Sequence, residues 1–147
     1  MRILSGPSKF YTSLIVVSNQ IWRFSYDPDS FQQIIESGTL PFPEINPHVA
    51  GKHNTIDKII NDMSVGSFVI LANFKVFENT ATVRAGGIVE DISGGQLSIR
   101  WKRIVPSISL HPHKIGAQQW ERESVFLINA PRAREFKLDA LRKKLFS

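Results

Sequence analysis

The sequence predicts an α+β domain built around a mixed, strongly curved, barrel-like sheet with a few flanking helices. The chain has 147 residues, of which 42% are hydrophobic and 21% charged, and this profile is typical of one globular domain. Short apolar or alternating runs are interspersed with helical patterns, without regular strand–helix–strand alternation. No 20- to 50-residue repeat and no Gly/Ser-rich linker divides the sequence, so we expect residues 1–147 to form a single domain.

Two strands are predicted in the first part of the chain. Ser13–Ser18 (SLIVVS) is apolar between its polar ends, which is the pattern of a central strand buried on both faces. Residues 21–26 alternate, so that Trp22, Phe24 and Tyr26 share one face of a second strand. These aromatic side chains are candidates either for the core or for a binding surface.

A short helix and a proline-rich segment are predicted next. Asp29 or Ser30 provides the helix cap, and Gly38 suits the left-handed position that follows a helix. Three prolines and Gly51 predict that Thr39–Asn54 is a long irregular loop or lid. The apolar side chains on one side of the helix are Phe31, Ile34 and Ile35.

The middle of the chain predicts a second helix followed by two strands. The helix begins at Asn54 or Thr55, and its apolar residues have the spacing of a buried stripe. Phe68–Phe74 is an apolar strand. Thr80–Ile92 is a strand in which the glycines at 86–87 mark a bulge or a close approach of another backbone. The buried stripe of the helix consists of Ile56, Ile59, Ile60 and Met63.

The last third of the chain predicts two strands and an amphipathic helix. A turn at the glycines 94–95 leads into a strand over Gln96–Ile104, and the chain is irregular from Pro106 to Gly116. Ser124–Ile128 is a short strand, and Arg134–Phe146 is a helix. The long strand points Leu97, Ile99 and Trp101 one way and Ser98, Arg100 and Lys102 the other, while the helix buries Phe136, Leu138, Leu141 and Leu145.

The charge distribution gives the first indication of function. The formal net charge is +5 and the sequence pI is about 9.7. From Arg100 onward the net charge is +7, whereas the preceding part of the chain carries −2. A polyanion would therefore be attracted to the C-terminal part of the chain.

Several classes of chemistry are not expected from this sequence. The absence of cysteine excludes a cysteine nucleophile, a CxxC redox pair and thiolate metal sites. His111 and His113 form the tightest histidine pair, but His48 and His53 lie in a different predicted loop, so no three-ligand zinc set is indicated. A GxSxG elbow, a P-loop and a GxGxxG sequence are all missing. We therefore expect no metal, no cofactor and no enzymatic activity.

Three segments of the chain carry a family resemblance. They are LIVVSN at 14–19, residues 54–92 with MSVGSFVILANF and AGGIVEDI, and QLSIRWKRIVPSISLHPHKIG at 96–116. Together these segments resemble the PUA-like superfamily in its YTH and EVE branch. This branch contains readers of modified bases, including the N-terminal domains of McrB-type restriction systems. The resemblance implies a PUA-like curved sheet or barrel that binds nucleic acid.

The resemblance also implies roles for individual residues. Ser18 and Asn19 match the polar pair at the floor of the YTH pocket, where the Asn reads the base edge, and Trp101 matches a structural tryptophan. Thr39 and Leu40 occupy the position of the first cage tryptophan, and the loop before the LSIRW strand lacks the second. The remaining candidates for a stacking wall are Trp22, Tyr26 and Phe42.

The expected function is that of a non-enzymatic reader domain that accommodates a modified base in an aromatic pocket. N6-methyladenine is the favoured base, and DNA is slightly favoured over RNA because the Trp22 region resembles the McrB-type branch. An effector protein is a possible further partner, and a cytoplasmic protein without membrane contact is expected. The residues expected to contact phosphates are Arg100, Lys102, Arg103 and Lys114.

Two alternatives of other classes remain open. The first is a protein-interaction adaptor whose C-terminal helix docks on a partner. The second, less favoured, is a small hydrolase that uses His111, His113 and a carboxylate.

Overall fold

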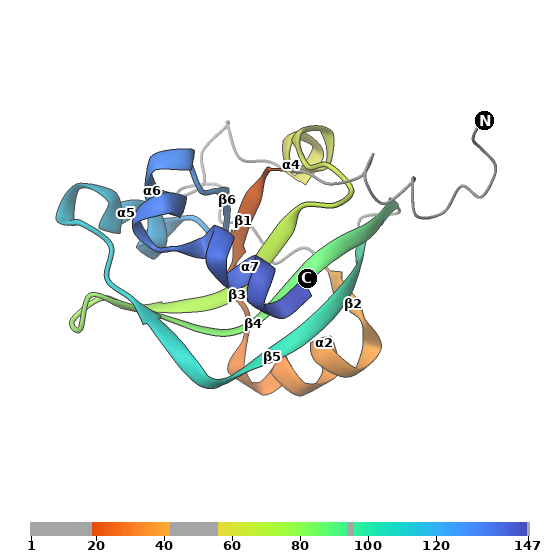
Figure 1. Cartoon of the computed structure of the whole chain (residues 1–147), viewed down its shortest axis with the longest axis horizontal. Coiled ribbons are helices and arrows are strands. Elements are labelled where there is room, and N and C mark those ends of the chain that lie inside the picture. Colours follow the sequence, from red (N-terminus) through yellow and green to blue (C-terminus); the bar gives the residue numbers. More distant parts are fainter. Residues whose placement is uncertain (1–18, 42–55, 94–95, 147) are drawn as a thin grey trace.

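The computed structural model describes residues 19–41, 56–93 and 96–146. These residues form a six-stranded mixed sheet in the order β2-β5-β4-β3-β1-β6, flanked by helices (Figure 1). The β1–β3 pairing is parallel, and the other four pairings are antiparallel. The predicted α+β class with a mixed sheet is confirmed. The elements are β1 (Ile21–Phe24), the 3-10 helix η1 (Pro28–Ser30), α2 (Phe31–Ser37), β2 (Thr39–Pro41), α4 (Ile56–Asp62), β3 (Phe68–Lys75), β4 (Thr80–Ser93), β5 (Gln96–Leu110), α5 (Lys114–Arg122), β6 (Val125–Leu127), α6 (Ala130–Glu135) and α7 (Leu138–Phe146).

The sheet is packed on both faces, and each face has its own hydrophobic cluster. Along β3, Phe68 and Ile70 belong to the cluster that includes residues of α5 and α7, whereas Val69 and Leu71 belong to the cluster that includes residues of α2 and α4. This alternation follows from the two-residue period of a strand. β3 is therefore a strand buried on both faces. The segment predicted for that role, Ser13–Ser18, lies outside the described residues.

Two of the predicted helices are confirmed. α2 buries Phe31 and Ile34 and ends at Gly38, whose φ of 71° is the left-handed conformation that glycine adopts without steric cost. Its N-cap, Ser30, makes no side-chain cap bond; Asp27 caps the preceding η1 instead. α4 buries Ile59 and leaves Ile60 partly exposed, and Met63 just after it is also buried. The predicted start of this helix lies outside the described residues.

The glycine pair in β4 does not form a bulge. β4 is continuous, and its register shifts lie at Val83/Ala85 and Val89/Asp91. A Cβ on Gly87 would lie 2.3 Å from Ile99 Cγ2 and 2.7 Å from Trp101 Cε3. Glycine is therefore required at position 87 because two side chains, and not another backbone, pack closely against it.

The prediction of irregular chain from Pro106 to Gly116 was wrong at both ends. β5 continues to Leu110, and α5 begins at Lys114. In the β4–β5 pairing Val83 lies opposite Ile108 and Ala85 opposite Arg103, so four residues of β5 face the single residue Arg84. This irregularity accommodates Pro106, which cannot donate a hydrogen bond to the ladder. Figure 1 shows the corresponding bend of β5.

The proline-rich segment was also predicted too broadly as irregular. β2 pairs antiparallel with β5, placing Thr39 opposite Ser98 and Pro41 opposite Gln96. A proline is tolerated there because β2 is at the edge of the sheet. Residues 42–54 of the predicted loop lie outside the described part of the chain, as do the turn glycines 94–95.

The C-terminal helix is divided into two. α6 ends at Glu135 and α7 begins at Leu138, and Lys137 between them has a φ of 59°. Asn129 caps α6 by accepting a hydrogen bond from the Arg132 amide at 3.0 Å. The predicted inward face is confirmed, because Leu138 and Leu141 are buried in the cluster to which Phe136 and Leu145 also contribute. None of the helices in the described residues is long and apolar enough to cross a membrane.

Candidate nucleic-acid interface

Four basic side chains of the β4–β5 hairpin lie over two phenylalanine rings. Arg100 and Lys102 lie 5.2 and 5.4 Å from the centroid of Phe146, at the end of α7. Arg84 and Arg103 lie 4.1 and 5.2 Å from the centroid of Phe31, at the start of α2. Phe146 packs on the cluster of one face of the sheet and Phe31 on the cluster of the other, so each face carries one pair of positive charges. Both rings restrict the positions of long, flexible side chains.

Most of these positive charges remain open to solvent. Arg100 forms a long ion pair with Glu90 at 3.6 Å, and both side chains are more than half exposed, so the attraction is strongly screened. Arg103 donates a hydrogen bond to Gln32 of α2. Lys102 has no carboxylate partner among the described residues. The side chain of Lys114, the fourth predicted phosphate contact, lies outside the described side chains.

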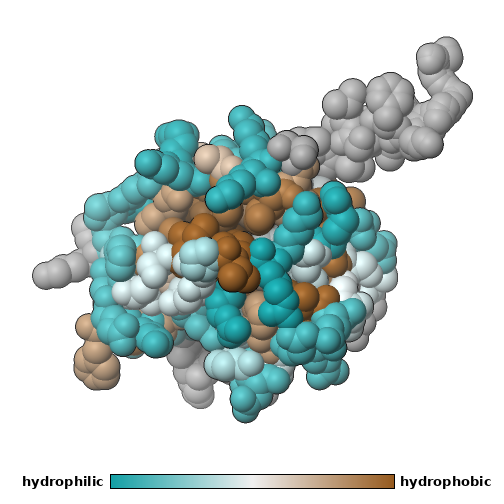
Figure 2. Space-filling view, turned by 60° about the horizontal axis from the view of Figure 1, so that its bottom comes forward, coloured by the Kyte–Doolittle hydropathy of each residue, from teal (hydrophilic) through white to brown (hydrophobic). Residues whose placement is uncertain are grey.

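The basic surface extends from the hairpin along the C-terminal helices. Phe146, which lies under Arg100 and Lys102, is the last residue of α7, and α6 and α7 follow each other directly. On the face seen in Figure 2, hydrophilic side chains surround a patch of hydrophobic ones, so the surface is mixed rather than uniformly charged. The basic residues of α6, of α7 and of the two-residue segment between them are Arg132, Arg134, Lys137, Arg142, Lys143 and Lys144.

The residues predicted to bind the base do not meet in one pocket. Asn19 is exposed and lines a depression next to the start of β1, together with Asn129 and Arg134. Trp22 is only 3% exposed and belongs to the core, where its Nε1 donates to Gln20 Oε1 at 3.1 Å. Its ring is covered, so in this structure the proposed stacking wall is a core residue.

Tyr26 lies beyond the other end of β1 and is separated from Asn19 by the length of this strand. Its ring packs 5.3 Å from that of Phe31 and lines a different depression, near Asn73. Thr39 hydrogen-bonds to Ser37, two residues earlier at the end of α2. Only the backbone of Leu40 is described, and it pairs with Leu97. Ser18 and Phe42 lie outside the described residues.

A buried arginine in β1 was not predicted from the sequence. Arg23 is 2% exposed, and its Nε donates to the carbonyl of Ala72 at 2.9 Å. Its Nη1 donates to the carbonyls of Trp120 and Glu123 at 3.0 and 2.7 Å. Burial lowers the pKa of Arg23 to about 10, which leaves it charged at neutral pH. Because the two Nη1 bonds end at the C-terminus of α5, the guanidinium compensates the negative end of that helix.

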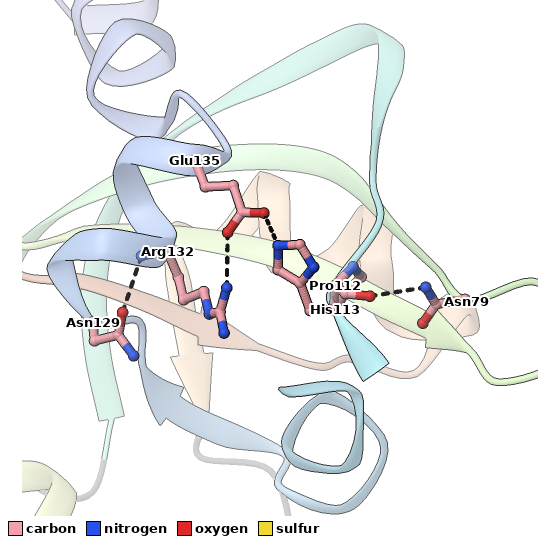
Figure 3. Close-up of polar contacts among 6 residues, drawn as sticks. All are labelled: Asn79, Pro112, His113, Asn129, Arg132 and Glu135. Carbon is pink, nitrogen blue, oxygen red and sulfur yellow. Dashed lines mark hydrogen bonds and ion pairs between the residues drawn. The ribbon is translucent and has the colours of Figure 1, made fainter. Parts of the chain in front are cut away.

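A cavity of about 140 Å³ lies between α5, β6 and α6. Glu135 bridges two of its lining residues: one carboxylate oxygen accepts from Arg132 Nη1 at 2.9 Å, and the other lies at hydrogen-bond distance from His113 Nε2 (Figure 3). The hydrogen bond from Arg132 holds the pKa of Glu135 below its usual range, and His113 adds to this effect. Trp120, Phe126 and Phe136 form the aromatic part of the wall.

His111 and His113 have different partners and do not contact each other's partners in the described part of the chain. His111 Nδ1 lies near Thr80 Oγ1 and the Asn79 carbonyl, whereas His113 pairs with Glu135. Within the described residues, no group of three or more His, Asp or Glu side chains is arranged to hold a metal ion. Among the described residues that line the cavity beside His113, none carries a hydroxyl or thiol nucleophile. His48 and His53 lie outside the described residues.

Comparisons with protein-family models, curated proteins and solved structures found no match to this chain.

Proposed function

We propose that the protein is a PUA-like reader domain that binds nucleic acid and accommodates a modified base, with N6-methyladenine as the first base to test. The observation that carries the proposal is the presence of two exposed cations on each face of the β4–β5 hairpin, one pair over Phe146 and the other over Phe31. Positive side chains restricted in this way suit phosphate contacts, which fix the position of a strand without reading its sequence.

The location of the base is the second part of the proposal. Asn19 is exposed and borders a depression, so its amide is available to pair with a donor and an acceptor on a base edge. Trp22 is buried, so the stacking wall has to come from another residue. Phe42, in the proline-rich segment, is the next candidate for the stacking wall.

The adaptor alternative receives less support from the structure. The apolar side of α7 is already covered, because Leu138 is 1% exposed and Leu141 8% exposed within the chain's own core. That side is therefore not available to a partner without opening the fold. The hydrolase alternative lacks a hydroxyl or thiol group beside the His113–Glu135 pair among the described lining residues.

The test is a binding titration with matched methylated and unmethylated oligonucleotides, single- and double-stranded, of DNA and RNA. The dissociation constant is measured over a series of salt concentrations for the parent chain and for the double variant Lys102→Ala/Arg103→Ala. Removing two phosphate contacts should weaken binding of all oligonucleotides similarly and lower the log–log salt slope by up to about 2. Asn19→Ala should reduce the preference for the modified base and leave the salt slope unchanged.

The matched control is the double variant Lys75→Ala/Arg122→Ala, which removes the same charge from exposed positions away from the two rings. If this control lowers the salt slope as much as the first variant, the hairpin is not the binding surface. Absence of salt-dependent binding to every oligonucleotide would refute nucleic-acid binding altogether.

A further inference from the structure

We propose that the protein forms a symmetric dimer in which Phe77 of each copy inserts into the cavity between α5, β6 and α6 of the other. Phe77 lies in the turn that joins β3 to β4, and its side chain is fully exposed. The contact is between two copies of the chain and does not rest on nucleic-acid binding. The cavity shares Ile128 and Asn129 with the Asn19 depression, so the dimer contact borders the proposed base site.

The turn that carries Phe77 is held in a fixed position. Asn79, two residues later, has the left-handed φ of 47°, and its backbone amide donates to the Val76 carbonyl at 3.1 Å. Its side-chain Nδ2 donates to the Pro112 carbonyl at 2.8 Å, which ties the turn to the segment between β5 and α5. A ring presented by a fixed turn loses little conformational freedom when a partner buries it.

The cavity begins next to this turn. Pro112, which accepts the hydrogen bond from Asn79, lines the cavity, and so does His113 after it. Figure 3 shows Asn79 beside Pro112 and His113. A projecting ring and a cavity that are neighbours on one surface can engage the same two features of a second copy related by a two-fold axis. One symmetric contact therefore makes two insertions.

The size of the cavity matches one phenyl ring. Its volume is about 140 Å³, and an apolar cavity of about 150 Å³ in another protein holds one benzene molecule. Trp120 contacts Phe126 and Phe136 edge to face, with ring centroids 5.2 and 6.1 Å apart, which gives the cavity an aromatic wall. On the polar side the cavity is lined by Arg132, and a guanidinium is a favourable neighbour for the face of a ring.

The charges at the turn and at the cavity are balanced. Lys75 directly precedes the turn and Glu78 lies within it, while Arg132 at the cavity is paired with Glu135. Two copies can therefore approach through this surface without the repulsion expected from the net charge of +5. Association through buried rings should depend little on salt, in contrast to phosphate binding.

The test is sedimentation equilibrium over a series of protein concentrations, without nucleic acid. The parent should show a monomer–dimer equilibrium. Phe77→Ala should raise the dimer dissociation constant at least about 100-fold, because both insertions lose an aromatic ring that is central to the contact. The matched control is Val105→Ala, which truncates an exposed apolar side chain on β5, and it should leave the constant unchanged. A parent that stays monomeric at millimolar concentration, or a Phe77→Ala variant with the parental constant, would overturn the proposal.

A mixture of two variants tests the insertion itself. Phe77→Ala lacks the ring and keeps the cavity, whereas Gly116→Leu keeps the ring and fills the cavity. A Cβ on Gly116 would meet no atom within 4 Å, so the added side chain has open space beside the cavity. The mixture restores one insertion and should associate at least about tenfold more tightly than either variant alone. No gain on mixing two folded variants would refute the site, and Gly116→Ala should still dimerise.

Cross-linking locates the contact. The chain contains no cysteine, so single cysteines can be placed without background. Glu78→Cys, beside the ring, should form a disulfide with Gln119→Cys of a second preparation, because Gln119 is exposed and lines the cavity. Lys58→Cys on α4 is the control and should not react with Gln119→Cys. Equal cross-linking of the control would refute the contact.

Other occupants of the surface give different results. If the parent is monomeric and Phe77→Ala weakens oligonucleotide binding, the ring contacts a base and the dimer is refuted. Assemblies larger than a dimer would show that the ring and the cavity engage head to tail, which overturns the two-fold arrangement.

Discussion

Replacing the buried Arg23 by methionine should destabilise the fold by about 3 kcal/mol. The change leaves three carbonyl oxygens, of Ala72, Trp120 and Glu123, without the donors that now lie 2.7–3.0 Å away. Each unsatisfied buried acceptor costs about 1–3 kcal/mol, so the loss is about 6 kcal/mol in total. Methionine also removes the cost of burying a charge. Burial lowers the pKa of Arg23 from its ordinary value to about 10, which makes this cost about 3 kcal/mol.

The assay is urea unfolding followed by circular dichroism, with the free energy of unfolding obtained from the midpoint and slope. Arg23→Lys should lose less than Arg23→Met, because an ammonium group keeps part of the hydrogen bonding to the carbonyls. Arg122→Met is the matched control, since Arg122 is an exposed arginine of the same helix end, and it should lose less than about 1 kcal/mol. An Arg23→Met variant with the parental midpoint would show that the three hydrogen bonds contribute no net stability, and the reasoning would be wrong.

Three further predictions concern packing and pH. Gly87→Ala should lose about 1–3 kcal/mol in the urea assay because its Cβ would overlap Ile99 and Trp101, whereas Gly116→Ala, which points into open space, should lose nothing. Leu141→Ala should lose about 2–5 kcal/mol; parental stability would mean that α7 does not pack as described. The lowered pKa of Glu135 contributes stability above its ordinary value of 4.5 that is lost as the pH falls through the folded value. Glu135→Gln should therefore show a weaker fall of the urea midpoint in acid than the parent does, and an unchanged pH profile would contradict the contact with Arg132.

The strands could be predicted from the sequence because their pattern is local. The alternation of Leu97, Ile99 and Trp101 with polar residues in β5 matches their burial in a single cluster, with Trp101 at its margin. The left-handed Gly38 was equally predictable, because few residues other than glycine adopt this conformation at a helix end. These features depend on neighbours in sequence rather than on distant contacts.

Other features depend on contacts that a local pattern does not contain. α5 was missed because its sequence shows no buried apolar stripe. Among the side chains of α5 that the structure describes, Trp120 is the large apolar one. The division between α6 and α7 depends on a positive φ at Lys137, a residue type that does not signal such a conformation. The order β3-β1-β6 joins strands that are far apart in the chain.

Arg23 is the clearest case of a residue whose role is set by distant contacts. In an alternating strand it reads as a solvent-facing position, and its burial arises only because the Ala72 carbonyl and the end of α5 converge on it from 49 and about 100 residues away. The same convergence bears on the candidate site, because the guanidinium lies 5.2 Å from the Trp120 ring. Trp120 in turn forms part of the wall of the cavity beside Arg132 and His113. A buried charge in β1 thus supports the aromatic wall, so loss of Arg23 should disturb the packing of Trp120 as well as lower stability.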